Sequence, residues 1–568
     1  MVTYNLLEER WIPCTMRDGT ATHESISTVL EHAHERIEIT TSSPVVTIAL
    51  HRLLLAVIHR ALRPQSAAAG PADADEWEKL WQRGALDMTV IGGYLDSQRA
   101  YFDLFDTVRP FYQDPTLDVQ YARSVTSLTH EMTTDGAILF DHTTPADNAA
   151  FTPAQAARYL VAYHAFALGG RVTFEKGQNG DVYGSADAGP LTKGAPILVQ
   201  GDTLFQTLML NLVRYDRTDD EPFTMSPDDL PAWERTVPTR AEDRLPLGYL
   251  DFLTWQSRRI RLYPETGDSG EIVVHRVTAM KGYQFPELGS RFTRETMLAF
   301  RVNARATKKE DPYPAVALQR ERSVWRDSNA LFFAVSKERP RTLRWLEELN
   351  AASVLHSSQA YHLDVYGLCV SRGSVFFWRH ERLPLPLAYL NDGDLRAILD
   401  IALRLAEGVG HALWIAAHRF ACWMFVPEPS VDGKESDRRK QYADKTGRGK
   451  QIKDLRNALA PGRRYWPMLD SSFSTFLVAQ AEERARDGTT GQITIGPAFR
   501  RWSDAVQRAA WSDFHAMFGT LAPTPASFQA WAFAERQFVS GLSKTMEAAG
   551  VPESDLHMKG EEMVPDDA

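Results

Sequence analysis

One change in residue pattern divides the 568-residue chain near residue 390. Before it, short β-rich runs alternate with helical stretches and with many Gly and Pro residues. After Pro384, Pro386 and the turn at 391–393, patterns typical of strands almost vanish. The chain is therefore predicted to have an α+β fold, with a large mixed α/β N-terminal domain over residues 1–390 and an all-α domain after it.

Four long amphipathic helices are expected in the C-terminal domain. Their expected bounds are Asp394 to about Trp423, about Met468 to Arg486, about Pro497 to Phe518, and Pro525 to about Ala549. Asp392 or Asp394 is available to cap the first helix, and Gly550 follows the last. Four successive helices predict a four-helix bundle over 391–550, followed by a flexible acidic tail over 551–568.

A basic segment interrupts the expected bundle between its first two helices. Residues 430–464 hold eleven Lys or Arg against five acids, a net charge of +6 in a chain whose net charge is −10. Such a segment could follow a phosphate backbone by releasing counterions. It could equally be a disordered, solvated insertion, and the sequence leaves both interpretations open.

The N-terminal domain contains several recognisable elements. Strands are expected at 197–199, 272–274 and 365–370, a helix at 44–62 and an apolar helix at 204–212. The helix at 44–62 is expected to present one apolar stripe. Eight glycines between Leu168 and Gly201 are too many for a helix, so this stretch is predicted to be loop and turn.

Cysteine and apolar patterns predict a soluble cytoplasmic protein that does not enter a membrane. The three cysteines are far apart and form no CxxC pair, which favours a reducing compartment. No uninterrupted apolar run approaches the roughly 20 residues needed to cross a bilayer. The N-terminal stretch carries acids where a signal peptide has basic and apolar residues.

Sequence motifs for catalysis, metals and cofactors are lacking. The chain has no GxxxxGK[ST] phosphate loop, no HExxH and no GxSxG. The pairs His130-Glu131 and Asp141-His142 resemble fragments of a catalytic dyad, although local capping is the favoured interpretation. The prediction is that the protein is not an enzyme and needs no metal or cofactor. The alternative is a metal-dependent nuclease that uses these four residues.

Arginine and lysine clusters near aromatic residues suggest contact with nucleic acid. Such side chains clamp phosphates and stack on bases, but they also form ordinary ion-paired surfaces, and the sequence leaves both interpretations open. The clustered residues are Arg258, Arg259, Arg261, Arg301, Arg305, Lys308, Lys309, Arg320, Arg322 and Arg326.

A known family shares a series of motifs with this chain, in the same order and along nearly its whole length. The motifs are NLLEERWIPC (5–14), PVVTIALHRLLLAVIHRAL (44–62), FDLFDTVRPFYQDP (102–115), LFDHTT (139–144), GYLDFLTWQSRRIRL (248–262), DPYPAVALQRERSVWRDS (311–328) and FWRHERLPLP (377–386). Together they resemble the large subunit of the type I-E CRISPR Cascade complex, the CasA-type protein.

This resemblance implies an antiviral role inside an RNA-guided complex. The large subunit would recognise the short protospacer-adjacent motif (PAM) on double-stranded DNA, help to start strand opening and recruit a helicase-nuclease, while guide pairing reads the sequence. The implied partners are CRISPR RNA, the target duplex, the backbone and small helical subunits, and the helicase-nuclease. A purely structural assembly scaffold is a further alternative.

The resemblance also suggests which residues touch DNA. The family's glycine loop, which enters the minor groove at the PAM, corresponds to the stretch around Lys193, Gly194 and Ala195, where only Gly194 is glycine. A lysine that touches PAM base edges corresponds to Lys281. Minor-groove acceptors distinguish A·T from T·A poorly, so such a reader is expected to tolerate several PAM variants.

Two further loops are assigned by the resemblance. A β-hairpin tip that splits the first base pair is expected at Ser371, Arg372 and Gly373, where relatives typically carry glutamine and this chain offers Arg372. A loop toward the RNA handle and the adjacent backbone subunit is expected over Thr126–Asp147. It includes His130, Asp141 and His142. Since the chain lacks the cysteine cluster of some relatives, no zinc site is expected.

Overall fold

The computed structural model describes most of the 568-residue chain. The residues outside the description are 1, 63–70, 72, 130–148, 174–182, 215–227, 268, 287–294, 302, 304, 308–313, 329–330, 332–338, 372–373, 426–447, 488–495, 520 and 553–568. The predicted tail over 551–568 therefore lies outside the described residues, apart from Val551 and Pro552.

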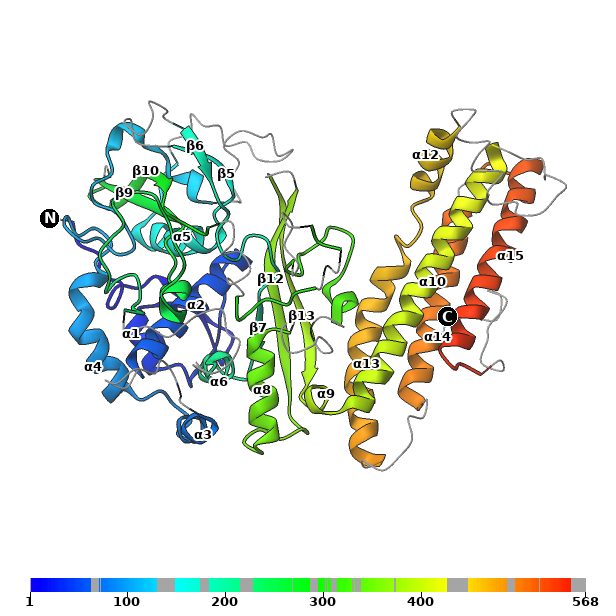
Figure 1. Cartoon of the computed structure of the whole chain (residues 1–568), viewed down its shortest axis with the longest axis horizontal. Helices are drawn as coiled ribbons and strands as arrows, with labels where there is room; N and C mark the ends of the chain where they lie inside the picture. The colour runs from blue at the N-terminus through cyan, green and yellow to red at the C-terminus, as the bar shows by residue number, and fades with distance from the viewer. Residues whose placement is uncertain are drawn as a thin grey trace. The chain divides into compact units, whose positions relative to one another are not determined.

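Two compact units make up the chain, Met1–Leu383 and Pro384–Ala568 (Figure 1). The boundary lies close to the one expected at residue 390. The first unit mixes helices and strands, whereas the described part of the second is helical apart from the last residues of strand β13. The predicted α+β class is confirmed.

The first unit contains the strands and helices expected from the sequence, together with several shorter elements. Its helices are α1 (Ile26–Glu31), α2 (Pro44–Ala61), α3 (Ala74–Gln82), α4 (Met88–Gln98), α5 (Pro153–Phe166), α6 (Leu204–Asn211), α7 (Tyr249–Leu253) and α8 (Arg341–Ala351). Its strands are β1 (Ile12–Met16), β2 (Ala21–Glu24), β3 (Arg36–Ile39), β4 (Arg123–Ser124), β5 (Gly170–Thr173), β6 (Tyr183–Ala186), β7 (Ile197–Gln200), β8 (Glu242–Asp243), β9 (Arg258–Thr266), β10 (Ile272–Lys281), β11 (Tyr283–Gln284), β12 (Ala360–Ser371) and β13 (Ser374–Pro386).

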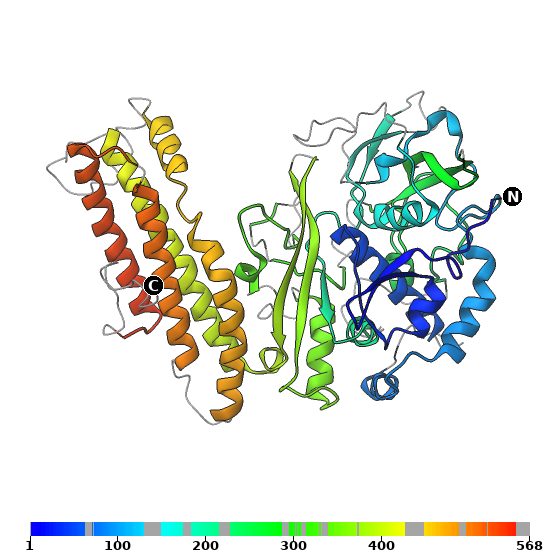
Figure 2. The ribbon, with the colours of Figure 1, turned by 180° about the vertical axis from the view of Figure 1, so that it is seen from behind.

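Small sheets organise the first unit. One has the strand order β2-β1-β3, and a second has the order β4-β10-β5-β6, with β9 paired antiparallel to β10. A third has the order β13-β12-β7, and β8 pairs with β11. Figure 2 shows β12 and β13 as a long hairpin beside the shorter β7. The hairpin is attached to the rest of the unit through β7, which pairs with the first half of β12.

Helix α2 forms the centre of the first unit. Every residue from Val45 to His59 is buried, so the expected single apolar stripe is wrong: the helix is covered on all sides. It packs against α4, α5, α6, α7 and β12. Among the described residues, α2 is the one helix long and apolar enough to cross a membrane, and 83% of that window is buried inside the protein.

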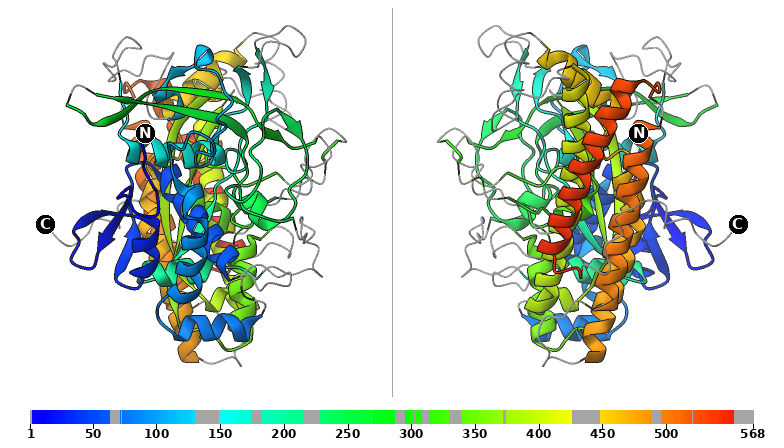
Figure 3. Two further views of the ribbon diagram at one scale, coloured as in Figure 1. Left: turned by 90° about the vertical axis from the view of Figure 1, so that its left-hand side faces the viewer. Right: turned by 90° about the vertical axis from the view of Figure 1, so that its right-hand side faces the viewer.

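The second unit contains the four long helices at the expected places. Its helices are α9 (Ala388–Asn391), α10 (Gly393–Phe425), α12 (Gly449–Leu459), α13 (Tyr465–Asp487), α14 (Pro497–Phe518) and α15 (Pro525–Ala548). Asp392 caps α10, since its Oδ1 accepts the N–H groups of Asp394 and Leu395 at 2.8 and 3.1 Å. The right-hand view in Figure 3 shows α10, α14 and α15 side by side.

Close approach and aromatic packing hold this bundle together. Helix α10 contacts α13, α14 and α15, and α13 contacts α14. A Cβ on Gly408 would lie 2.5 Å from the Thr545 side chain, so glycine is what lets α10 and α15 approach there. The rings of Phe514 on α14 and Phe538 on α15 stack with centroids 4.8 Å apart.

The described end of the basic segment is an ordered helix. Residues 430–447 lie outside the description, but α12 covers 449–459 and packs against α10. Its Ile452 is buried against Ala421 and Cys422 of α10. The interpretation of residues 430–464 as a disordered insertion is therefore wrong for residues 449–459, which form α12.

Candidate nucleic-acid interface

The turn at residues 191–195 has one exposed residue, a lysine, between buried neighbours. Lys193 is exposed, whereas Gly194 and Ala195 are buried. A Cβ on Gly194 would lie only 2.5 Å from a methyl carbon of Leu298, so the glycine makes room for an internal side chain. The sequence predicted that Gly194 lets DNA approach the backbone. The geometry gives that residue a packing role and leaves Lys193 as the side chain that faces outward.

Strand β12 passes directly against this turn. The amide of Tyr366 donates to the carbonyl of Pro196 at 2.9 Å, and the amide of Ala195 donates to the carbonyl of Val316 at 2.8 Å. At Gly367, with φ +149°, an added Cβ would lie 3.0 Å from the carbonyl oxygen of Gly194. Glycine is required there both by the backbone conformation and by the closeness of the two chains.

The residues expected to form the wedge, Ser371 to Gly373, come between the two strands of the same hairpin. Strand β12 ends at Ser371 and β13 begins at Ser374, so the turn between them falls at Arg372 and Gly373, which lie outside the described residues. At about 3.3 Å per residue, the hairpin reaches roughly 17 Å from Gly367 to the turn. The turn at 191–195 and the hairpin tip, expected from separate motifs, are thus joined through one pair of touching strands.

Lys281 lies at the end of β10, on a different sheet. Its Nζ is 3.8 Å from Asp243, and its side chain is 23% exposed. It is opposite Arg258 in the β9–β10 ladder. The Arg258 guanidinium donates to the carbonyls of Leu168 and Asp187 at 2.7 and 2.8 Å. Lys281 is therefore anchored beside the glycine-rich stretch that precedes the turn at 191–195.

The loop expected to reach the RNA handle is anchored at both ends on β10. Thr126 lies in a short 3-10 helix that follows β4, and β4 pairs with Arg276 and Val277 of β10. The chain returns at Phe151, which bridges Val274 of the same strand. His130, Asp141 and His142 lie outside the described residues, as does Glu131 of the nuclease alternative.

Three arginines of the first predicted cluster are used inside the fold. Arg258 is 1% exposed and Arg259 is 3% exposed. The Nε of Arg259 donates to Asp114 at 2.7 Å, and Arg261 donates to the carbonyl of Leu117 at 3.0 Å. Arg259 and Arg261 hold the segment at 114–117, and Arg258 holds the carbonyls of Leu168 and Asp187. Of the two interpretations left open for this cluster, nucleic-acid contact is therefore contradicted for buried Arg258 and Arg259.

The other clusters are divided between internal and exposed positions. Arg301 and Arg322 both pair with buried Asp327. Arg305 and Arg320 are exposed. Arg326 is partly buried, and Lys308 and Lys309 lie outside the described residues. Part of this predicted cluster is thus an ion-paired surface, which was one of the two interpretations left open.

An exposed tryptophan lies beside the basic helix of the second unit. Trp414 on α10 is 39% exposed, and the rings of His411 and His418 stack near it at 5.9 and 5.3 Å. The guanidinium of Arg456 on α12 lies 4.8 Å from the Trp414 ring centroid. Lys450 and Lys453 on α12 are exposed. Cations next to an aromatic face are features that bind single-stranded nucleic acid.

A buried carboxylate near the base of the hairpin was missed by sequence reasoning. Asp364 on β12 is fully buried and accepts from Arg382 on β13 at 2.6 and 2.7 Å. Burial acts to raise its pKa, but the hydrogen bonds from Arg382 and His380 outweigh burial and lower the pKa to about 2. No motif marks it, because its partners come from different strands.

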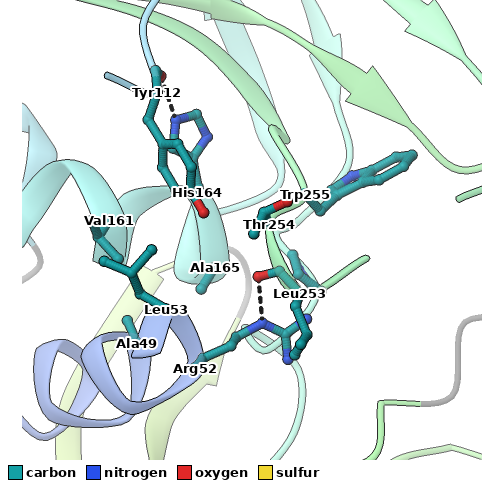
Figure 4. Close-up of a pocket in the computed structure, with 11 residues that line it drawn as sticks. Ala49, Arg52, Leu53, Tyr112, Val161, His164, Ala165, Leu253, Thr254 and Trp255 are labelled. Atoms are coloured by element: carbon teal, nitrogen blue, oxygen red, sulfur yellow. Dashed lines mark hydrogen bonds between the residues drawn. The ribbon is translucent and has the colours of Figure 1, made fainter. Parts of the chain in front are cut away.

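A pocket is lined by residues of α2, α5 and α7 (Figure 4), and by Pro190, which precedes the 191–195 turn. Arg52 of α2 donates to the carbonyls of Leu253 and Phe252 at 3.0 and 2.8 Å. Burial lowers the pKa of His164 to about 4, so its imidazole is neutral at pH 7. Arg52 thus joins α2 to α7, and His164 of α5 hydrogen-bonds the carbonyl of Tyr112 at 3.1 Å. Among the described residues, no three His, Cys, Asp or Glu side chains gather as metal ligands.

Family comparison agrees with the sequence resemblance. The model of the family CRISPR-associated protein Cse1 matches residues 5–512. The chain belongs to the Cse1 (CasA) family. The CRISPR-associated protein CasA/Cse1 of Thermus thermophilus is 32% identical over 511 residues, which cover 88% of this chain and 91% of that protein.

Solved structures share the fold along nearly the whole chain. The crystal structure of Cse1 from Acidimicrobium ferrooxidans has a TM-score of 0.77 at 25% identity, covering 96% of this chain and 99% of that one. A chain of a CRISPR RNA-guided surveillance complex has a TM-score of 0.68 at 19% identity, covering 95% of this chain and 100% of that one. The family predicted from the motifs is confirmed, and the last comparison shows a shared fold.

Proposed function

We propose that this Cse1-family protein is the non-catalytic large subunit of an RNA-guided antiviral complex of the Cascade type. It recognises the PAM on double-stranded DNA, helps to start strand opening and recruits a helicase-nuclease. The contact between Gly194 and Gly367 carries the proposal. It couples a turn with one outward-facing cation, Lys193, to strand β12, which continues from Gly367 to Ser371.

The energetics of opening require such a coupling. Unpairing and unstacking the first base pairs costs a few kcal/mol, and contacts made to a correct PAM must offset this cost. A recognition turn that shares its backbone support with the opening element can link the two events. Lys193 and Lys281 supply donors for base edges or phosphates, and Arg372 can stack on an exposed base.

The proposed partners follow from the relatives. A chain with the same fold belongs to a CRISPR RNA-guided surveillance complex. By analogy, the partners here are CRISPR RNA, backbone and small helical subunits, the target duplex and, after opening, the helicase-nuclease. The basic surface of α12 beside Trp414 offers a second nucleic-acid contact. The three free cysteines fit a cytoplasmic location.

Capture of a PAM-bearing duplex by the assembled complex tests this function. The Lys193→Ala and Lys281→Ala variants should each weaken capture at least about 5-fold, which corresponds to the loss of about 1 kcal/mol or more expected for one base-edge contact. Assembly should be unchanged. Lys79→Ala is the matched control, since Lys79 is an exposed lysine on α3 of the same unit.

Strand opening is followed separately by base reactivity. The double change Arg372→Ala, Gly373→Pro should leave PAM capture near normal and slow opening. If a complex lacking this chain captures and opens its targets equally well, or if all these variants behave as the unmodified protein, the assignment is wrong.

A further inference from the structure

Buried Asp364 contacts three side chains of the hairpin. Besides both hydrogen bonds from Arg382, it accepts the Tyr366 hydroxyl at 3.2 Å, and His380 Nε2 lies 3.3 Å away. The rings of Tyr366 and His380 are stacked, with centroids 4.6 Å apart. Arg382 also binds Glu38 of β3 at 3.0 Å. A carboxylate and an arginine thus connect β12, β13 and a strand of a different sheet.

Side chains on the opposite face of β13 also form hydrogen bonds with the rest of the unit. Arg379 donates to the carbonyls of Gln319 and Arg322 at 3.2 and 3.4 Å. The neighbouring Glu381 accepts the amide of Val324 at 2.8 Å. Since side chains alternate along a strand, odd and even residues from 379 to 382 hold the two faces of β13 against different parts of the unit.

These contacts are confined to the base of the hairpin. The fastened part of β12 ends at Tyr366, and Gly367 follows at the contact with Gly194. From Cys369 onward, the side chains of the arm that can be described are only partly buried. A charge-assisted, two-pronged arginine–carboxylate pair fixes direction as well as distance, because both groups are planar. A small rotation at the base would move a tip roughly 17 Å away by several ångströms.

We propose that the Asp364–Arg382–Glu38 network is the mount that sets the direction of the β12–β13 hairpin, so that its tip meets the first base pair next to the PAM. The inference rests on the proposed function of the hairpin. Asp364 and Arg382 are positioning residues, which act on DNA only through the tip.

The test uses the assembled complex with Asp364→Asn and Arg382→Gln. Each variant should capture a PAM-bearing duplex within about twofold of the unmodified complex but open it at least about fivefold more slowly. A target whose first base pairs are already mismatched should restore normal loading, because it needs no wedge. Arg382→Lys, which keeps the charge, should have an intermediate effect and serves if the stronger variants assemble poorly.

The matched control is Arg60→Gln. Arg60 makes a comparable two-pronged pair with Glu234, with both distances 2.8 Å, at the end of α2. This change should leave both capture and opening unaltered. It shows whether loss of any such pair in the unit is enough to slow opening.

The direction of the hairpin can be measured directly. Of the three cysteines, Cys14 and Cys422 are buried, whereas Cys369 is partly exposed near the tip and accepts a spin label. A second label at Lys79→Cys gives a distance distribution that should broaden in Asp364→Asn and stay narrow in Arg60→Gln. If Asp364→Asn only destabilised the protein and did not reorient the hairpin, the label-to-label distance distribution of the folded molecules would stay unchanged.

The outcomes separate this inference from the function it rests on. Suppose that the tip variant Arg372→Ala, Gly373→Pro opens DNA slowly while Asp364→Asn opens it normally. The positioning role of Asp364 is then refuted, and the proposed strand-opening role of the hairpin tip is retained. If the tip variant also opens DNA normally, the proposed role of the hairpin fails first. Slow opening that the mismatched target does not restore likewise contradicts the mount.

Discussion

A methyl group at Gly194 tests whether that glycine serves packing or DNA approach. In Gly194→Ala the new carbon would lie 2.5, 2.7 and 3.2 Å from the Cδ2, Cδ1 and Cγ of Leu298. Leu298 is 4% exposed, so its side chain has no open space into which to turn. Crowding of this kind in a packed interior costs about 1–3 kcal/mol.

The size of the thermal shift follows from the size of the unit. The first unit has 383 residues, and an unfolding entropy of about 2.1 cal/mol/K per residue gives roughly 0.8 kcal/mol/K. A cost of about 1–3 kcal/mol therefore lowers Tm by about 1–4 °C. Scanning calorimetry measures such shifts, and hydrogen exchange at the amides of Ala195 and Tyr366 shows whether the loosening is local.

A double-mutant cycle with Leu298→Ala assigns the cost to one contact. Leu298→Ala alone should cost about 2–5 kcal/mol, because it leaves a cavity. In the double variant the Gly194→Ala methyl enters that space, so the two costs should fall short of additive by about 1–3 kcal/mol. Gly93→Ala is the control: its Cβ meets nothing within 4 Å in helix α4, so it should stabilise by about 0.5–1 kcal/mol.

DNA capture then separates the two roles of Gly194. If packing alone matters, capture by the double variant should recover together with the local hydrogen-exchange protection. Capture that stays weak while protection recovers would mean that DNA meets the glycine directly. Additive costs, or a Gly194→Ala variant as stable as the unmodified protein, would refute the packing argument.

Three further predictions concern charges and catalysis. Arg259→Ala should destabilise the first unit by about 3–5 kcal/mol in urea unfolding, because it strands buried Asp114 without its partner. Lys453→Ala should lower the slope of log affinity against log salt by about 0.7–0.9 for single- or double-stranded DNA, whereas Lys544→Ala on α15 should not. Labelled nucleic acid incubated with the protein and Mg²⁺ or Mn²⁺ should stay intact, and cleavage lost in His142→Ala would support the nuclease alternative.

Local sequence signals predicted the helices well. Prolines at the first turns, Asp392 as a cap and the spacing of apolar residues place α10, α13, α14 and α15 within a few residues of their bounds. These signals act over one or two turns, so they can be read from a short stretch.

Long-range partners explain what could not be predicted. Arg259 was expected on the surface, but its carboxylate partner lies 145 positions away in the sequence. Arg382 joins Glu38 across 344 positions. A local pattern shows that an arginine is present. Whether its guanidinium pairs with an internal carboxylate or stays available for a phosphate depends on long-range contacts in the folded chain. The residues proposed to contact DNA are therefore the hardest part of this site to predict from sequence alone.

The depressed pKa of Asp364 predicts how the network responds to acid. Its pKa is about 2 in the folded protein, against 3.8 for an unperturbed aspartic acid, so the ionised form is favoured by folding. The resulting stabilisation, roughly 2 kcal/mol, is complete above about pH 5 and falls as the pH drops toward 2, with about 1 kcal/mol lost by pH 3. Asp364→Asn removes this titration, so the stability difference between the unmodified protein and the variant should shrink by that amount between pH 6 and pH 3 in urea unfolding. A difference that stays constant over this range would show that Asp364 is not held ionised by Arg382.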